Sequence, residues 1–213
     1  MAEPVQQPRF RVWTYAAPAV VLGCSQRSLL PAVAQRLPQG VELQARPSGG
    51  GAVLTGPWMV SASVALPLSH PWVQGRLPGS YQALGQLHVE VLASLGVPSQ
   101  ALPESEVDVA NARLGPVVGW ACFGSLAPWE VTDAQGRKLV GLAQRRQRTG
   151  VLLVAGTLMH LPDWSLLCQA LDQPGDLARM HERTTHCDAL STQPCDGNLL
   201  AQRLRQALAQ ALC

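Results

Sequence analysis

The run MVSASVALPL, residues 59–68, constrains the fold more than any other part of the chain, because it alternates apolar side chains with small or polar ones. A period of two is typical of a strand with one face buried. Four later segments are also expected to be strands, and the turns DAQG and QRTG separate the last three of them. These segments are residues 117–124, 130–133, 136–146 and 150–160. Since short turns join antiparallel neighbours, the pattern predicts an antiparallel or mixed sheet.

Helical patterns lie on both sides of these strands. Helices are expected at residues 28–37, 80–95, 163–173 and 198–212, the last capped by Asn198. A strand and loop are expected at 9–22, and a strand at 41–47. No repeat and no long linker divides the 213 residues. We therefore expect one α+β domain over residues 1–213, with helices flanking the sheet.

The composition argues against several classes of function. Charged residues make up 14% of the chain and the net charge is +2, which is too small to indicate nucleic acid. The dense basic cluster is Arg145, Arg146 and Arg148, which is either a docking face for an acidic carrier protein or a solvated strand edge. We expect no nucleic-acid partner.

The remaining compositional signals point to a cytoplasmic protein without a membrane or metal partner. No run approaches the roughly 20 apolar residues of a membrane span, and the N-terminus lacks the layout of a secretory signal. The six cysteines form no CxxC pair, so reduced thiols are expected. His181, His186 and Cys187 have no second pair at ligand spacing, and we expect no metal site.

The stretch SGGGAV, residues 48–53, follows the strand expected at 41–47. Consecutive glycines let a backbone approach a ligand closely and present amide groups to a phosphate or carboxylate. The stretch matches neither a P-loop nor a dinucleotide fingerprint. It is either a ligand-binding loop or a glycine-rich hairpin turn.

Lys138 is the only lysine in the chain, since the other 15 basic side chains are arginines. It lies at the start of an expected strand, where a lysine is often a solvated charge that protects a sheet edge. Where a lysine is functional, its compact ammonium group grips a carboxylate, carbonyl or phosphate that a planar guanidinium would not fit. Both interpretations remain open from the residue alone.

Cys122 lies in WACFGS, within the strand expected at 117–124. A free cysteine is commonly a small hydrophobic residue of the core. The alternative is a nucleophile, and a strand shifted by one residue would exchange the two roles.

Three segments taken together resemble a known family. ARPSGGGAVL, then ACFGSLAPWEV, then GRKLVGLAQRRQRTGVLLVAGTLM resemble the lipoate-protein ligase and octanoyltransferase family, which shares its fold with biotin-protein ligases. The strongest resemblance is to cysteine-dependent octanoyltransferases that act on lipoyl carrier proteins. It extends over roughly residues 9–190 and implies a single catalytic domain without an accessory domain.

The resemblance implies specific roles for individual residues. Cys122 would be the nucleophile that forms an acyl-thioester, and Lys138 would hold the acyl carbonyl or activated carboxyl of octanoate or lipoate. The substrate-binding residues would be Arg46, Ser48, Gly49, Gly50 and Gly51 in the glycine loop, Gly141 and Ala143 on one strand, and Gly156 and Thr157 on the next.

These roles lead to one main hypothesis and two alternatives. The main hypothesis is an acyltransferase without a cofactor, which takes octanoyl or lipoyl from an acyl carrier protein and passes it to a lipoyl domain or a glycine cleavage H-type carrier. The first alternative is a lipoate ligase that uses ATP and magnesium on free lipoate, with a separate accessory chain. The second is a non-catalytic binder of acyl carriers, suggested by the departures from the family pattern at Ala45, Thr55 and Gly56.

Overall fold

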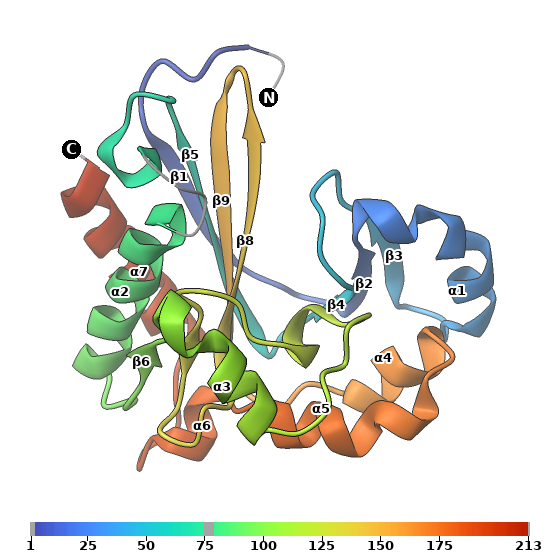
Figure 1. The fold of residues 1–213 in the computed structure, drawn as a ribbon. Coiled ribbons are helices and arrows are strands. Elements are labelled where there is room, and N and C mark those ends of the chain that lie inside the picture. The colour runs from blue at the N-terminus through green and yellow to red at the C-terminus, as the bar shows by residue number, and fades with distance from the viewer. Residues whose placement is uncertain (1–2, 75–78, 213) are drawn as a thin grey trace.

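A six-stranded antiparallel sheet runs through the molecule, and a three-stranded mixed sheet lies beside one of its faces (Figure 1). The computed structural model describes residues 3–74 and 79–212. The large sheet has the order β1-β5-β9-β8-β7-β6 and the small sheet the order β3-β2-β4. In the small sheet β2 is parallel to β3 and antiparallel to β4. The expected α+β fold with an antiparallel or mixed sheet is confirmed.

The strands and helices have the following bounds. The strands are β1 Arg9–Thr14, β2 Ala19–Leu22, β3 Glu42–Ala45, β4 Val53–Thr55, β5 Met59–Leu66, β6 Gln100–Ala101, β7 Val131–Thr132, β8 Lys138–Gln147 and β9 Gly150–Leu158. The helices are α1 Leu30–Arg36, α2 Gly79–Ser94, α3 Val107–Arg113, α4 Trp164–Ala170, α5 Leu177–Arg183, α6 Cys187–Leu190 and α7 Gly197–Leu212.

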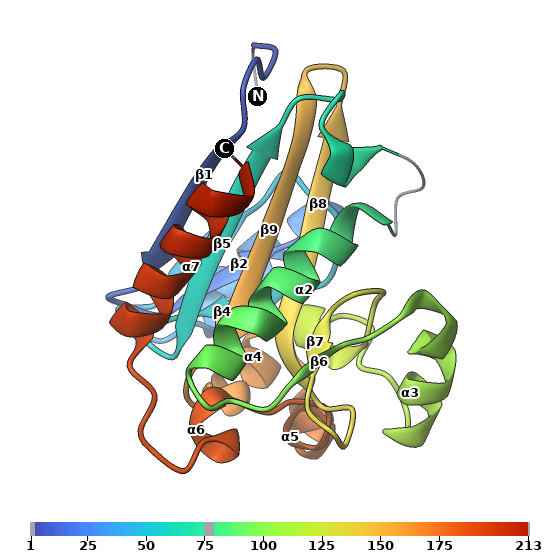
Figure 2. The same ribbon diagram turned by 90° about the vertical axis from the view of Figure 1, so that its left-hand side faces the viewer.

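The alternation in β5 gives the large sheet two different faces. Val60, Ala62 and Val64 are buried against helices α2 and α7, which cover one face of the sheet (Figure 2). We call this side the helix face. Ser61 lies between these residues and points to the opposite side, because successive side chains of a strand alternate. We call this opposite side the cavity face.

A second apolar core joins the small sheet to the C-terminal part of the chain. Val20 and Leu22 of β2 pack in it with Trp164 and Leu167 of α4. Because this core lies beside the large sheet, the small sheet and its helix α1 are held over the cavity face (Figure 1).

Two expectations about local structure are wrong. Residues 117–124 do not form a strand. Cys122–Gly124 form a 3₁₀ turn, and the amide of Val118 donates to the carbonyl of Gly124 at 2.8 Å, which closes residues 118–124 into a loop. Gly124 permits this closure, because a Cβ there would lie 2.1 Å from the carbonyl oxygen of Val118. Helix α7 begins at Gly197, and the Asp196 carboxylate, not Asn198, accepts the first-turn amide.

Within residues 3–74 and 79–212, none of the helices has both the length and the apolar character that crossing a bilayer requires.

Candidate active site

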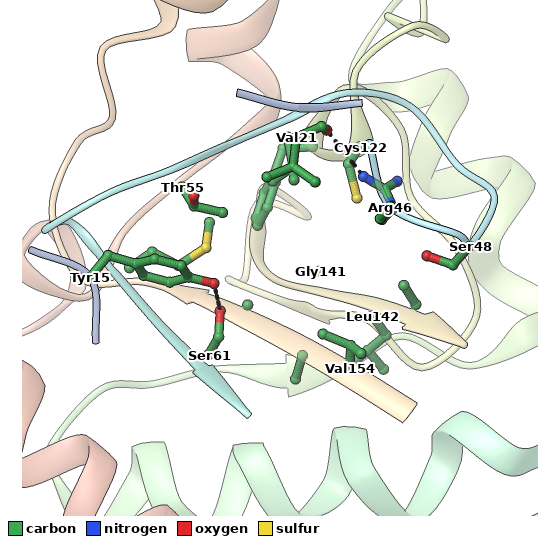
Figure 3. Close-up of a pocket in the computed structure, with 16 residues that line it drawn as sticks. Tyr15, Val21, Arg46, Ser48, Thr55, Ser61, Cys122, Gly141, Leu142 and Val154 are labelled. Carbon is green, nitrogen blue, oxygen red and sulfur yellow. Dashed lines mark hydrogen bonds between the residues drawn. The ribbon is translucent and has the colours of Figure 1, made fainter. Parts of the chain in front are cut away.

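A cavity of about 160 Å³ lies between the cavity face of the large sheet and the small sheet (Figure 3). We call it the central cavity. Small residues form its floor, and the antiparallel register places them side by side. One row across three strands consists of Ser61 of β5, Gly156 of β9 and Gly141 of β8. The next row continues with Val154 and Ala143. The cavity exists because these positions lack large side chains.

The central cavity is elongated and mostly apolar. Val21 and Val53 of the small sheet line it from the side opposite the floor. Figure 3 shows Cys122, Arg46 and Ser48 toward one end and Tyr15 at the other. Among the sixteen described residues that line the cavity, Arg46 is the only charged one. The shape and the lining suit one narrow alkyl chain with a polar group at the Arg46 end.

Arg46 organises the glycine loop from within. Its guanidinium donates to the carbonyl of Gly49 at 3.0 Å, to that of Gly51 at 2.7 Å and to that of Val21 at 3.2 Å. Gly50, between the two loop acceptors, has φ +92°, a conformation that favours glycine. These bonds go to neutral carbonyls, so the positive charge of Arg46 has no carboxylate partner among them.

The glycine loop packs directly against the turn that carries Cys122. The amide of Ala52 donates to the carbonyl of Trp120, and the amide of Cys122 donates to the carbonyl of Ala52, both at 2.7 Å. A Cβ on Gly51 would lie 2.5 Å from the Trp120 oxygen, so only glycine allows this approach. The thiol of Cys122 points into the central cavity (Figure 3).

Lys138 lies beneath the same turn and is 2% exposed. Its ammonium group donates to the carbonyl of Cys122 at 2.7 Å and to that of Ser125 at 3.0 Å, and it forms an ion pair with Glu130 Oε1 at 2.6 Å. An ammonium group has three donors, and each has an acceptor here. Lys138 therefore fixes the backbone on which the Cys122 thiol is mounted.

Glu130 is the counter-charge of Lys138 and is fully buried. Burial raises the pKa of Glu130, and Lys138 opposes this rise together with the amides of Leu142 and Ala127, which donate to its carboxylate. Each carboxylate oxygen has an amide donor, and one also has the ammonium group. The pair is thus completely hydrogen-bonded, as a buried ion pair requires.

The structure brings most of the expected site residues together around the cavity. Cys122, Arg46, Ser48, Gly141, Ala143 and Gly156 line it. Gly49, Gly50, Gly51, Lys138 and Thr157 do not. Thr157 follows Gly156 in β9, pairs with Val60 and Val140, and is buried on the helix face. The side chain of Thr157 points to the helix face, because successive side chains of a strand alternate between its faces, and Thr157 does not line the cavity.

Tyr15, Ser61 and Glu130 are among the residues of the site that were not identified from the sequence. Tyr15 and Ser61 line the cavity and are joined by a hydrogen bond of 2.8 Å across 46 positions of the chain. Glu130 pairs with Lys138. The acidic residue in the APWEV motif was a signal for Glu130, whereas Tyr15 and Ser61 belong to no motif.

The remaining candidates lie away from the central cavity. Arg145 and Arg146 are neighbours in β8, so their side chains point to opposite faces of the sheet, and Arg148 follows the strand. Arg146 donates to the carbonyl of Val73. In the part of the chain that the structure describes, no three His, Cys, Asp or Glu side chains are grouped as metal ligands.

An α+β fold with a narrow apolar cavity between its sheets and a thiol at one end suits a catalytic domain of the ligase and acyltransferase class, and the family comparison shows that class. The model of the lipoyl protein ligase A/B catalytic domain family matches residues 1–207, and the chain belongs to this family. The family that the motifs resemble is thereby confirmed.

Individual relatives agree with this assignment. The chain is 33% identical to octanoyltransferase LipM of Kyrpidia tusciae over 207 residues, which are 95% of this chain and 73% of that protein. It is 32% identical to octanoyltransferase LipM of Moorella thermoacetica over 179 residues, 81% of this chain and 60% of that protein. The chain thus spans less than the full length of both relatives.

The fold is also similar to that of solved structures. A chain from the structural analysis of a bi-partite lipoate protein ligase and its E2 lipoyl domain from Thermoplasma acidophilum superposes with a TM-score of 0.69. The match covers 99% of this chain and 73% of that chain, at 16% sequence identity. At this identity the likeness concerns the fold.

Proposed function

We propose that this chain is an octanoyltransferase that carries an octanoyl group on Cys122 and passes it to a lysine of a lipoyl carrier domain. The observation that carries the proposal is the position of the Cys122 thiol at one end of an apolar cavity. The names of the relatives support the same activity. The acyl donor is an octanoyl-loaded carrier protein, and the acceptor is a lipoyl domain or an H-type carrier of the glycine cleavage system.

The reaction has two balanced steps. In the first, the Cys122 sulfur forms a bond to the carbonyl carbon of the donor thioester, and the donor carrier leaves as a thiol with the proton of Cys122. In the second, the acceptor lysine amine attacks the new thioester, an amide forms, and Cys122 returns to a thiol. Splitting the transfer lets two large carriers use one site in turn.

The described residues suit the requirements of both steps. The central cavity holds the alkyl chain, and each buried methylene contributes roughly 0.8 kcal/mol to its binding. Arg46 supplies a positive charge near the end where the carbonyl oxygen becomes negative. Lys138 acts as a positioning residue, because its donors hold the carbonyls of Cys122 and Ser125 on the reactive turn.

The alternative functions differ from this proposal in what they require. A lipoate ligase would need ATP, magnesium and free lipoate, and its adenylate would have to form beside Arg46, where Ala45 offers no second charge. A non-catalytic binder would leave Cys122 unmodified. Neither alternative adds an acyl group to Cys122, and the two differ in whether a lipoyl domain becomes modified when ATP, magnesium and lipoate are supplied.

The test is intact-mass spectrometry after incubation with octanoyl-loaded acyl carrier protein, without ATP. Wild type is expected to gain one octanoyl group that hydroxylamine removes. Cys122→Ser is expected to gain none, while Cys24→Ser, which removes an exposed thiol away from the cavity, behaves as wild type. Addition of a lipoyl domain should then move the octanoyl group onto that domain.

Other outcomes would contradict the proposal in defined ways. Modification of the lipoyl domain by Cys122→Ser only when ATP, magnesium and lipoate are present would indicate the ligase. Binding of the loaded carrier without any covalent adduct in wild type would indicate the non-catalytic binder.

A further inference from the structure

We infer that Tyr15 sets the length of the acyl chain, because its side chain separates the central cavity from a second hollow that lies beyond it. The inference rests on the proposed function, since it concerns the chain that the central cavity would hold. The second hollow has a volume of about 520 Å³ and lies between the connection from β1 to β2 and the small sheet. We call it the side hollow.

The two spaces share part of their walls. Tyr15, Val21 and Thr55 line both the central cavity and the side hollow, so these three side chains form the partition between them. Tyr15 is the largest of the three. Val21 lies within β2 and Thr55 at the end of β4, where its hydroxyl donates to the carbonyl of Ala19. Tyr15 lies just after β1 and outside any strand, so the partition depends on its ring.

The ring of Tyr15 is held in its closing position by two contacts. Its hydroxyl donates to Ser61 Oγ at 2.8 Å, and Ser61 is a nearly buried residue of the cavity floor. Its ring meets that of Trp13 edge to face, with centroids 6.2 Å apart. Burial raises the pKa of Tyr15, so the hydroxyl stays protonated and donates at neutral pH.

Tyr15 lies where the end of a bound chain would arrive. Figure 3 shows Cys122 and Tyr15 at different ends of the central cavity, with the row of small floor residues between them. An acyl group attached to Cys122 Sγ and laid along this floor would direct its terminal methyl group at the Tyr15 ring. The ring would therefore stop chains that are longer than the cavity.

The side hollow offers a suitable space for a longer chain once the ring is removed. Ala16, Ala17, Ala19 and Trp13 give it an apolar wall, while Glu42 and Gln44 of β3 also line it. Loss of the Tyr15 side chain beyond Cβ would join this surface to the central cavity. The chemical class of the ligand would remain an acyl group, and only its permitted length would change.

The test compares acyl carrier proteins loaded with chains of six to fourteen carbons, supplied in competition and read by intact mass of the protein. Wild type is expected to take octanoyl over dodecanoyl. Tyr15→Ala is expected to raise the ratio of dodecanoyl to octanoyl adduct at least tenfold. Tyr15→Phe is the matched control, because it loses the bond to Ser61 but retains the ring, and it should keep the preference of wild type. If Tyr15→Ala does not fold, Tyr15→Leu replaces it with the same expected direction.

The outcomes separate this inference from the proposed function. An octanoyl adduct on wild type with an unchanged length profile in Tyr15→Ala would overturn the inference and leave the function standing. Absence of any adduct would overturn the function, and calorimetric binding of free octanoate and dodecanoate would then test the inference. If the ratio of dodecanoate affinity to octanoate affinity is no higher in Tyr15→Ala than in wild type, the calorimetry would overturn the inference about Tyr15.

Discussion

The single lysine of the chain has a structural reason to be a lysine. Lys138 is buried beside three acceptors, because one carboxylate and two backbone carbonyls accept its three N–H groups. A guanidinium would bring five donors in a planar fork, two of which would lack acceptors in the same space. The expectation that Lys138 holds the acyl carbonyl stays a prediction; since its three donors already have acceptors, the ammonium group would have to leave one of them to bind an acyl group.

The first prediction concerns the ion pair under Cys122. Lys138→Met should lower the free energy of unfolding by about 3–5 kcal/mol at pH 7, because it leaves the buried Glu130 carboxylate without its counter-charge. Loss of Lys138 removes an influence that lowers the pKa of Glu130, so that pKa rises further above its ordinary value of 4.5. The deficit in stability relative to wild type should be smallest below pH 4.5 and should grow as pH rises toward neutrality, because the buried Glu130 then loses its proton. Urea unfolding at several pH values measures this.

The matched control for this prediction is the double variant Lys138→Met, Glu130→Gln. A neutral amide at position 130 has no proton to lose, so the decline in stability with rising pH should disappear. A decline of the same size in the double variant would show that another group causes it.

Sequence reasoning at the residue scale identified Lys138 because it is the only lysine and the glycine loop because of its three consecutive glycines, whereas the role of Cys122 came from the resemblance to the family. It did not identify Tyr15 and Ser61, whose contact joins positions 46 residues apart and depends on the pairing of β1 with β5. A local sequence pattern cannot predict a contact between residues so far apart in the chain. The roles assigned to the site residues remain proposals.

At the scale of elements, the strands with clear alternation were predicted well. The expected segments 59–68, 136–146 and 150–160 correspond to β5, β8 and β9, which supply the cavity floor. The segment 117–124 was predicted as a strand because it is apolar, yet its backbone bonds to itself and to Ala52. Apolar composition alone cannot distinguish a strand from a buried turn, because both exclude water. The short helices α3, α5 and α6 also lacked a clear periodic signal.

The second prediction concerns helix α2. His88 is fully buried on this helix; its Nδ1 contacts the carbonyl of Leu84, and its Nε2 has no partner within the described residues. Burial lowers the pKa of His88 from 6.5 to about 4, so the ring is neutral in the folded chain. The stability that this provides is present above pH 6.5 and is lost as pH falls toward 4. The loss is about 3 kcal/mol at roughly 1.4 kcal/mol per pH unit.

His88→Leu should remove this part of the pH dependence between pH 7 and 4, measured by thermal or urea unfolding. His181→Gln is the control, because His181 is exposed on α5 and its replacement should leave the dependence as in wild type. An unchanged profile in His88→Leu would contradict the assignment.

At the scale of the whole molecule, the large sheet separates a layer of helices from a layer that encloses the central cavity. Helices α2 and α7 pack on the helix face, whereas the small sheet, the glycine loop and the Cys122 turn lie over the cavity face (Figures 1 and 2). The central cavity is the space left between the large and small sheets. A bound alkyl chain would therefore connect these two sheets without touching the helix layer.

The third prediction follows from this arrangement. Octanoylation of Cys122 should slow amide hydrogen exchange in residues 46–55 and 118–125 roughly tenfold. A tenfold slowing corresponds to about 1.4 kcal/mol, which burial of about two methylenes at ~0.8 kcal/mol each would supply. Exchange in α2 and α7 should not change. Hydrogen exchange with mass spectrometry measures both, and Cys122→Ser treated in the same way is the control. Equal slowing in the helix layer would argue against a chain held between the sheets.

The register of the large sheet has a consequence for how such a protein can diversify. Along β5, β8 and β9 the side chains that point to the cavity face and those that point to the helix face take alternate positions, although Leu142 and Ala155 of the second set also reach the cavity wall. Substitutions at every second position can therefore retune the substrate without disturbing the core, provided that the strands keep their length. A single residue inserted into or deleted from one of these strands would exchange the two sets, so insertions are expected in the loops. A combinatorial library for new acyl specificities should leave the neighbouring positions fixed and vary Ser61, Gly141, Ala143, Val154 and Gly156.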